Sequence, residues 1–385
     1  MSDVVIAGIG QTPVGEHWEL SLRTLAVRAI QAARQDAGGL RPQAMYVGNF
    51  LASMISHQAN LGALLAEWSG LEGIEAYTLE SAGASGGSAF RQGYLAVASG
   101  LVDVALVVGV EKYNDAIGPQ LEAALAQTGD YDYEMVQGMT PVTQAAILMQ
   151  RYMYEHNVPR PAFGEIPLLA HANGVNNPYA LFQKAIRREV YDGSEFYSDP
   201  LNMFDMAPYA DGAAAVLLTR QALLPAHHPY PVVRVSGSSS VIDRLALHDR
   251  PDPLAFEAAG RSIQQACRQA GILPTDVDFF ELCDTFSIFA YLSLEAAGYA
   301  PPGEAWKMAA DGRLALKGDL PILTMGGLKA RGNPIGATGV YQVVEAVLQL
   351  RGLAGKNQIP NARRGLVQCL GGPASTAVSH VLQRI

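Results

Sequence analysis

A strand that runs directly into a turn of small residues and then a helix is the feature that most constrains this chain. A strand is expected at 76–81, a small-residue turn at 82–87, a helix at 90–99 and a second strand at 104–109. Such a strand–helix–strand order predicts parallel strands joined by a right-handed crossover. We therefore expect an α/β protein built on a buried sheet.

The same order recurs along the chain. Strand and helix patterns in residues 1–230 have counterparts in residues 231–385, and a proline- and histidine-rich linker at 225–231 separates the two. Residues from about 112 to 205 interrupt this rhythm with clusters of Asp, Tyr, Met and Pro. We expect two similar βαβ-type halves related by duplication, with a cap region inserted in the first half.

Composition excludes several classes of function. A formal net charge of -9 does not favour nucleic-acid binding. The apolar runs are too short for a membrane span, and the N-terminal residues lack the basic region of a leader peptide. The spacing of Cys267, Cys283 and Cys369 fits neither a metal site nor a disulfide framework, which favours a reducing compartment. The chain is expected to be cytoplasmic and to bind no metal.

Four short segments rich in small residues follow expected strands. They are residues 81–87, 283–286, 326–339 and 369–372. Ligands bind at the carboxyl ends of strands in open α/β sheets, and helix N-termini offer free N–H groups there. Each segment alone is also explained by the need for a tight turn. Together they predict one binding site.

These segments, in this order, resemble the thiolases, and in particular the branch linked to sterol carrier protein. The resemblance covers nearly the whole chain, and its most specific part is the glycine-rich motif that ends in Asn333-Pro334-Ile335-Gly336-Ala337-Thr338-Gly339. The other matching stretches are Glu80 to Gly87, His171-Ala172-Asn173 with Asn177-Pro178, Asp211 to Ala215, Cys283 to Phe286, and Cys369 to Gly372. It implies a thiolase fold and an acyl-CoA ligand.

The catalytic positions of the family depart from its pattern. Gly83 stands where a thiolase has its nucleophilic cysteine, while Cys283 and Asn333 replace its two histidines. Only Cys369 matches, at the position of the acid/base cysteine. Without a thiolate at residue 83, the covalent acyl-enzyme of thiolase chemistry is not available there.

Three functions remain open from the sequence. The first is retro-aldol cleavage of a β-hydroxyacyl-CoA, which breaks the Cα–Cβ bond and forms the same thioester enolate without an acyl-enzyme. The second is a catalytically inactive acyl-CoA-binding scaffold. The third is acyl transfer that uses Cys369 or Cys283 as a substitute nucleophile.

The first function is supported by a resemblance to thiolase-like steroid side-chain-cleaving aldolases that lack the nucleophile. It implies that Tyr291 and Tyr341 form an acid/base pair assisted by Asp284, and that the substrate is a 17-hydroxy steroid side-chain CoA thioester cleaved to a 17-ketosteroid and propionyl-CoA. Position in the motifs further suggests that Asn333 binds the thioester oxygen together with backbone N–H groups near Gly83 and Gly372. The resemblance also implies a homodimer that recruits a small OB-fold, zinc-ribbon subunit to form a heterotetramer.

Other candidates contact the ligand rather than react with it. His171 matches a family stretch that lines the acyl pocket, and Lys329, Arg331 and Gly332 belong to the glycine-rich segment. The two cations are expected either to bind CoA phosphates or to form a solvated face. No cofactor is expected, because coenzyme A enters as part of the substrate.

Overall fold

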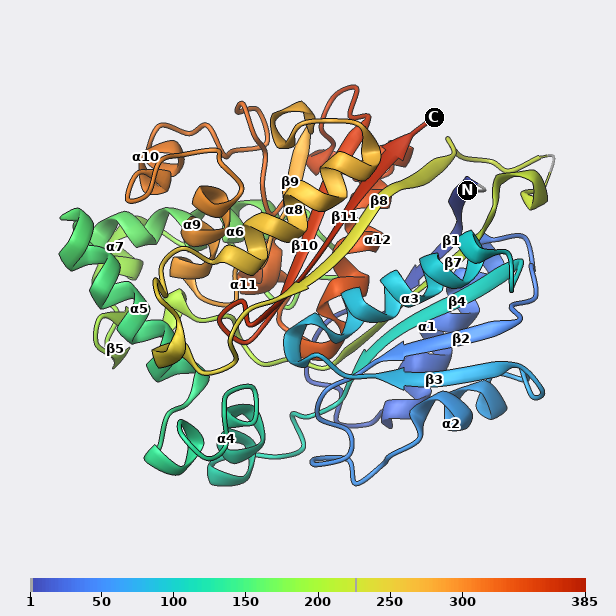
Figure 1. Cartoon of the computed structure of the whole chain (residues 1–385), viewed down its shortest axis with the longest axis horizontal. Helices are drawn as coiled ribbons and strands as arrows, with labels where there is room; N and C mark the ends of the chain where they lie inside the picture. Colours follow the sequence, from blue (N-terminus) through green and yellow to red (C-terminus); the bar gives the residue numbers. More distant parts are fainter. Residues whose placement is uncertain (1–2, 226) are drawn as a thin grey trace.

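One mixed sheet dominates the computed structural model, which describes residues 3–225 and 227–385 (Figure 1). Within these residues nine strands form the sheet, in the spatial order β3-β2-β4-β7-β1-β8-β11-β10-β9. They are β1 (Val4–Gln11), β2 (Ala44–Gly48), β3 (Glu75–Leu79), β4 (Val104–Glu111), β7 (Gly212–Arg220), β8 (Val233–Ile242), β9 (Phe279–Glu281), β10 (Arg364–Gly371) and β11 (Thr376–Arg384). A short hairpin of β5 (Phe196–Ser198) and β6 (Leu201–Asn202) stands apart. Residues 1, 2 and 226, at the expected N-terminus and linker, lie outside the described residues.

Strand pairing follows the βαβ pattern on one side and continues between the two halves. β2 lies between β3 and β4 and is parallel to both, as the crossover predicts. Every residue of β4 is buried, because helices cover both faces of the sheet. Val5 and Ile6 of β1 pair with β8, so the sheet runs without a break from the first half into the second.

Helices cover both faces of the sheet (Figure 1). Two of them, α3 and α12, contact each other and strands of both halves, whereas α1 covers β1 and β7, and α8 covers β8 and β11. The helices are α1 (Leu22–Asp36), α2 (Leu61–Trp68), α3 (Ser85–Ser99), α4 (Pro119–Ala126), α5 (Pro141–His156), α6 (Glu165–Gly174), α7 (Arg188–Asp192), α8 (Glu257–Ala270), α9 (Ser287–Ala296), α10 (Ala305–Ala310), α11 (Gly327–Arg331) and α12 (Thr338–Arg351). None of the helices within the described residues is long and apolar enough to cross a membrane.

The inserted region packs mainly on the second half. In Figure 1 its helices α5, α6 and α7 lie beside α9 and α10, at the left of the molecule. One apolar cluster joins Tyr152 and Ile166 of the insertion to Phe280 and Leu292 of the second half. The α/β architecture on a buried sheet that the sequence predicts is confirmed, and the inserted region packs against the second half.

Two of the expected small-residue loops contain helix. The turn after β3 is a single 3-10 turn at Ala82–Ala84, and α3 begins at Ser85 rather than at residue 90. The glycine-rich segment 326–339 contains the short helix α11 and the first two residues of α12. Small side chains allow these helices to begin close to neighbouring backbone, which the sequence pattern alone does not show.

Candidate active-site cleft

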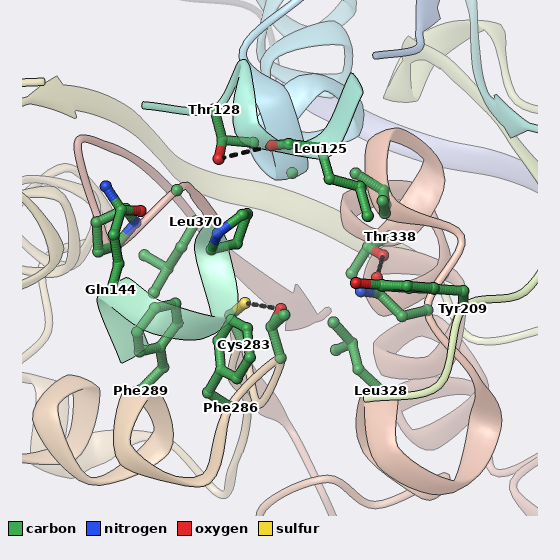
Figure 2. Close-up of a pocket in the computed structure, with 17 residues that line it drawn as sticks. Leu125, Thr128, Gln144, Tyr209, Cys283, Phe286, Phe289, Leu328, Thr338 and Leu370 are labelled. Carbon is green, nitrogen blue, oxygen red and sulfur yellow. Dashed lines mark hydrogen bonds between the residues drawn. The ribbon is translucent and has the colours of Figure 1, made fainter. Parts of the chain in front are cut away.

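Residues from all four small-residue segments surround one cavity of about 70 Å³, here called the cleft (Figure 2). Apolar side chains of the insertion and of α9 complete its wall. The lining residues are Gly83, Leu125, Thr128, Pro141, Gln144, Tyr209, Cys283, Thr285, Phe286, Phe289, Leu328, Asn333, Ile335, Thr338, Leu370, Gly372 and Pro373. The structure thus brings together Gly83, Cys283, Asn333 and Gly372 of the expected site.

No side chain fits at residue 83 with the backbone in this position. A Cβ atom built on Gly83 would lie 2.6 Å from the carbonyl oxygen of Leu370, well inside van der Waals contact. The backbone of β10 therefore occupies space that a nucleophilic side chain would need. The loss of the nucleophile is built into the geometry of the cleft as well as into the sequence.

Asn333 presents its amide group to the cleft. Its Oδ1 accepts a hydrogen bond from Thr338 Oγ1 at 3.1 Å, and within the described residues its NH₂ group has no partner. Its backbone N–H donates to Pro208 O at 3.0 Å, which fixes the residue beside the cleft. Since an amide NH₂ donates hydrogen bonds, Asn333 is suited to bind a thioester or enolate oxygen.

Tyr209 is a cleft residue that the sequence prediction missed. Its segment is held between two of the loops, because Ala207 N–H donates to Thr285 O at 2.8 Å and Asn333 N–H donates to Pro208 O. Figure 2 shows the ring reaching across one side of the cleft with its hydroxyl pointing inward, and no described residue hydrogen-bonds that hydroxyl. Burial raises the pKa of Tyr209, so the phenol is neutral at physiological pH.

The two site cysteines differ in position. Cys283 lines the cleft, and its Sγ lies 3.2 Å from Thr285 Oγ1, but burial raises the pKa of its thiol. Cys369 lies behind the turn, packed with Ala84 and Val378, and burial raises its pKa to about 12. Neither sulfur is a thiolate near neutral pH, and Cys369 does not line the cleft.

The expected tyrosine pair is not assembled at the cleft. Tyr291 donates its hydroxyl proton to Ala162 O at 2.6 Å, and Tyr341 donates to Thr12 O at 2.9 Å. Both side chains are fully buried, and neither lines the cleft. In this geometry neither phenol faces the cleft, because both already bond backbone carbonyls inside the core.

Asp284 also points away from the cleft. Its carboxylate accepts hydrogen bonds from Leu328 N–H at 2.7 Å and Lys329 N–H at 3.3 Å. It therefore fixes the start of α11, whose Leu328 lines the cleft. Asp284 therefore holds Leu328 in the cleft lining and does not contact a proton-transferring group there.

The expected CoA contacts are likewise elsewhere. Lys329 donates to Asp205 O and is buried, and Arg331 is buried against the ring of Tyr341, so neither cation reaches CoA phosphates from this position. Gly332 faces Val14 and Ala210. His171 lines a separate surface pocket with Phe182, and its Nδ1 bonds Lys184 O.

The loops of the cleft are held in strained conformations. Ala82 has φ 50°, Ile335 has φ 22° and Ala374 has φ 60°, all in a region that non-glycine residues rarely adopt. Such strain persists only where the surrounding structure enforces it, and it clusters at functional sites.

One buried carboxylate enforces the strain at Ile335. Glu111 at the end of β4 accepts N–H bonds from Phe50, Leu51 and Gly336, and a side-chain bond from Asn49. It thereby ties residues 49–51 to the turn that places Ile335 against the cleft. Sequence reasoning gave no signal for this role.

The lining side chains are uncharged. None of them is a carboxylate, a histidine, a lysine or an arginine. Nor does any group of three or more His, Cys, Asp or Glu residues within the described chain fit a metal ion. The cleft therefore offers neutral donors and acceptors around an apolar floor, an arrangement suited to a thioester rather than to a charged group.

Comparison with known proteins identifies the family of the chain. Residues 4–199 match the thiolase N-terminal domain, and residues 239–384 match the thiolase C-terminal domain-like family. The chain belongs to the thiolase superfamily, whose members act on acyl-CoA thioesters.

Individual relatives carry different activities. The chain is 38% identical to an acetyl-CoA acetyltransferase of Methanothermobacter thermautotrophicus, over 100% of both chains. It is 28% identical to the 17-hydroxy-3-oxo-4-pregnene-20-carboxyl-CoA lyase of Mycobacterium tuberculosis, over 90% of this chain and 91% of that protein. The solved structure of the Ltp2-ChsH2(DUF35) aldolase has the same fold, with a TM-score of 0.86, 24% identity, and coverage of 99% of this chain and 98% of that one.

Proposed function

We propose that this chain is a carbon–carbon lyase that cleaves a β-hydroxyacyl-CoA by a retro-aldol reaction without an acyl-enzyme. The observation that supports the proposal is the close approach of the Leu370 carbonyl oxygen to Gly83. This oxygen occupies the space that a nucleophilic side chain at residue 83 would need, whereas the uncharged cleft with its hydrogen-bond donors stays open. Such a cleft is suited to the thioester enolate that retro-aldol cleavage produces.

The NH₂ group of Asn333 donates to the thioester oxygen in this proposal. Negative charge grows on that oxygen as the Cα–Cβ bond breaks, and a preorganised donor stabilises it. Backbone N–H groups beside Gly83 and Gly372 are further candidate donors, since both residues line the cleft.

Tyr209 moves the proton in this proposal. The β-hydroxyl of the substrate gives its proton to the phenol oxygen while the phenol gives its own proton to Cα. The Cα–Cβ electron pair goes to Cα, the β-carbon becomes a ketone or aldehyde, and a shortened acyl-CoA leaves. Because no net proton is taken up or released, a neutral phenol of raised pKa is sufficient.

The identity of the substrate is a further part of the proposal. The lyase relative is named for a steroid carboxyl-CoA, which supports a 17-hydroxy steroid side-chain thioester cleaved to a 17-ketosteroid and propionyl-CoA. The cavity of about 70 Å³ is smaller than the roughly 150 Å³ that encloses a benzene molecule. A steroid ring system would therefore extend beyond the enclosed cleft.

A small partner subunit completes the proposal. The name of one structural neighbour includes a DUF35 chain, which supports a partner subunit for this chain as well. The OB-fold and zinc ribbon of that subunit, and the heterotetramer, belong to the same proposal and come from the sequence resemblance. Such a subunit would cover the part of the ligand that lies outside the cleft.

The reaction can be tested with two substrates. The purified chain, alone and with the partner, is given a β-hydroxyacyl-CoA, and separately a β-ketoacyl-CoA with free CoA. We expect a carbonyl compound and a shortened acyl-CoA from the first and no thiolysis of the second. Thiolysis, or an acyl adduct on Cys283 or Cys369 in mass spectra of the quenched protein, would sink the proposal.

The uncharged lining also favours a second candidate, an acyl-CoA-binding scaffold without activity. Its signature is tight binding of a non-cleavable acyl-CoA analogue with no turnover of any β-hydroxyacyl-CoA, with or without the partner.

A further inference from the structure

Gln144 on α5 is a buried polar side chain that the proposed reaction does not use. It is 2% exposed and lines the cleft. No described residue forms a hydrogen bond with its side-chain amide, although its backbone N–H donates to Thr140 O as part of the helix. The amide nitrogen and oxygen are not among the fully buried unpaired atoms of the described residues, so they face the open cleft. An unpartnered amide that faces a cleft on an otherwise buried side chain calls for an explanation.

The position of Gln144 separates it from the reacting atoms. Figure 2 shows Gln144 on one side of the cleft, and Tyr209 and Thr338 on the other. The proposed proton transfer by Tyr209 and the oxygen binding by Asn333, which bonds Thr338, both occur on that other side. Gln144 therefore meets a different part of the acyl group.

The surroundings of Gln144 restrict the kind of group it can bind. The hydroxyl of Thr128 already donates to Leu125 O, and Phe289, Leu370 and Pro141 are apolar. The nearby carboxylate of Glu134 accepts the N–H groups of Asp130 and Leu247. With no cation in the lining, an anionic group of a ligand would be left without compensation.

We propose that Gln144 determines specificity by binding a neutral oxygen, a ketone or a hydroxyl, on the acyl group at the end away from the reacting carbons. An amide both donates and accepts, so it can meet either oxygen type. Rejection of a carboxylate at the same position follows from the missing cation. The assignment of the substrate class rests on the proposed function, although the binding step does not.

The test uses β-hydroxyacyl-CoA substrates of equal length whose acyl ends carry a methyl, a ketone or a carboxylate. The full chain is compared with Gln144→Leu and with Gln150→Leu, a glutamine of the same helix that is exposed. We expect the wild type to favour the ketone over the methyl end by about tenfold in kcat/KM, as one amide hydrogen bond supplies. Gln144→Leu is expected to bring this ratio to about one, while Gln150→Leu leaves it unchanged.

Two further measurements separate recognition from structure and from catalysis. Leucine replaces an amide that no described residue hydrogen-bonds, so the Tm of Gln144→Leu should stay the same or rise, whereas a structural role would lower it. Dissociation constants of thioether analogues with the same three ends report binding without turnover. A ketone preference that is absent in the wild type, or unchanged in Gln144→Leu, overturns the inference. A preference in binding without any turnover overturns the lyase proposal alone.

Discussion

At the scale of single residues, Gly83 gives a direct test of whether the cleft still tolerates thiolase chemistry. A side chain there meets Leu370 O, with its Cβ only 2.6 Å away. We therefore expect Gly83→Cys to lower stability by about 1–3 kcal/mol through overpacking and to form no acyl-enzyme. Thermal unfolding and mass spectrometry after exposure to an acyl-CoA measure the two effects.

Two alanine substitutions isolate the contact. Gly83→Ala carries the same Cβ without sulfur and should lose about as much stability as Gly83→Cys. Gly15→Ala places its Cβ in open space, with His17 Nε2 the nearest atom at 3.9 Å, and should be close to neutral. An acyl thioester at position 83 would contradict the interpretation of the cleft.

Tyr209 supports a prediction about pH. Tyr209→Phe should lower turnover of a β-hydroxyacyl-CoA by about 100-fold or more and leave the binding of analogues nearly unchanged. Because burial raises the pKa of Tyr209, its protonated form persists to higher pH than a free phenol, whose pKa is about 10. The rate should therefore be flat from about pH 6 to pH 9 and fall only above that range.

Tyr291→Phe and Tyr341→Phe serve as controls for Tyr209. Their hydroxyls bond backbone carbonyls in the core, so these variants should lose stability rather than activity at equal folded concentration. A rate that rises through neutral pH, or full activity of Tyr209→Phe, would show that another group moves the proton.

The tyrosines also show what sequence could predict at this scale. Motif positions identified Gly83, Asn333 and Cys283, because backbone turns fix where these residues lie. Tyr291 and Tyr341 lie on helices α9 and α12, and helix packing turned both toward the core. Tyr209 lies in an irregular segment without periodicity, and only its hydrogen-bonded neighbours bring it to the cleft.

At the scale of elements, the Glu111 carboxylate joins β4 to two loops. Glu111→Gln places an NH₂ group against N–H donors of Phe50 or Gly336, which leaves buried donors unpaired. We expect a loss of about 2–4 kcal/mol in the free energy of unfolding, and weaker analogue binding as Ile335 shifts. Chemical denaturation and titration measure these effects.

Glu67→Gln is the matched control, since Glu67 is exposed on α2 and should tolerate the change. Unchanged stability of Glu111→Gln would show that the four hydrogen bonds do not hold the loops. A loss of stability with normal analogue binding would show that Glu111 stabilises the loops but does not affect ligand binding.

The sequence predicted the ends of helices and strands correctly where a helix cap or a buried apolar run determines them. The expected strand at 104–109 and helix at 22–37 correspond closely to β4 and α1, whose N-cap Ser21 accepts from Thr24 N–H. The glycine-rich segment was predicted as a loop, yet it contains α11 with Lys329 and Arg331 buried. Their charges suggested a surface. Only the tertiary partners explain their burial, Asp205 O for Lys329 and the Glu345 carboxylate with the Tyr341 ring for Arg331.

At the scale of the whole molecule, the cleft depends on both halves of the chain. Gly83 and Tyr209 come from residues 1–230, whereas Cys283, Asn333 and Gly372 come from residues 231–385. The continuous sheet across β1 and β8 and the shared packing of α3 with α12 hold these parts together. The sequence predicted the fold and the loops that meet at the cleft. Which side chains of these loops point into the cleft depends on packing between the two halves, so the sequence alone could not predict it.

The edge of the sheet supports the last prediction, a homodimer through β3. Among the described strands β3 pairs only with β2, so its outer N–H and C=O groups are free, and Tyr77 on it is 58% exposed. An exposed edge strand is a site for pairing with another chain, and a lysine there blocks pairing. We expect Tyr77→Lys to shift the mass measured by light scattering from dimer to monomer. Tyr154→Lys, at an 84% exposed position on α5, should remain dimeric. A monomeric wild type would show that the chain does not form the homodimer. A dimeric Tyr77→Lys variant would show that the dimer contact lies elsewhere.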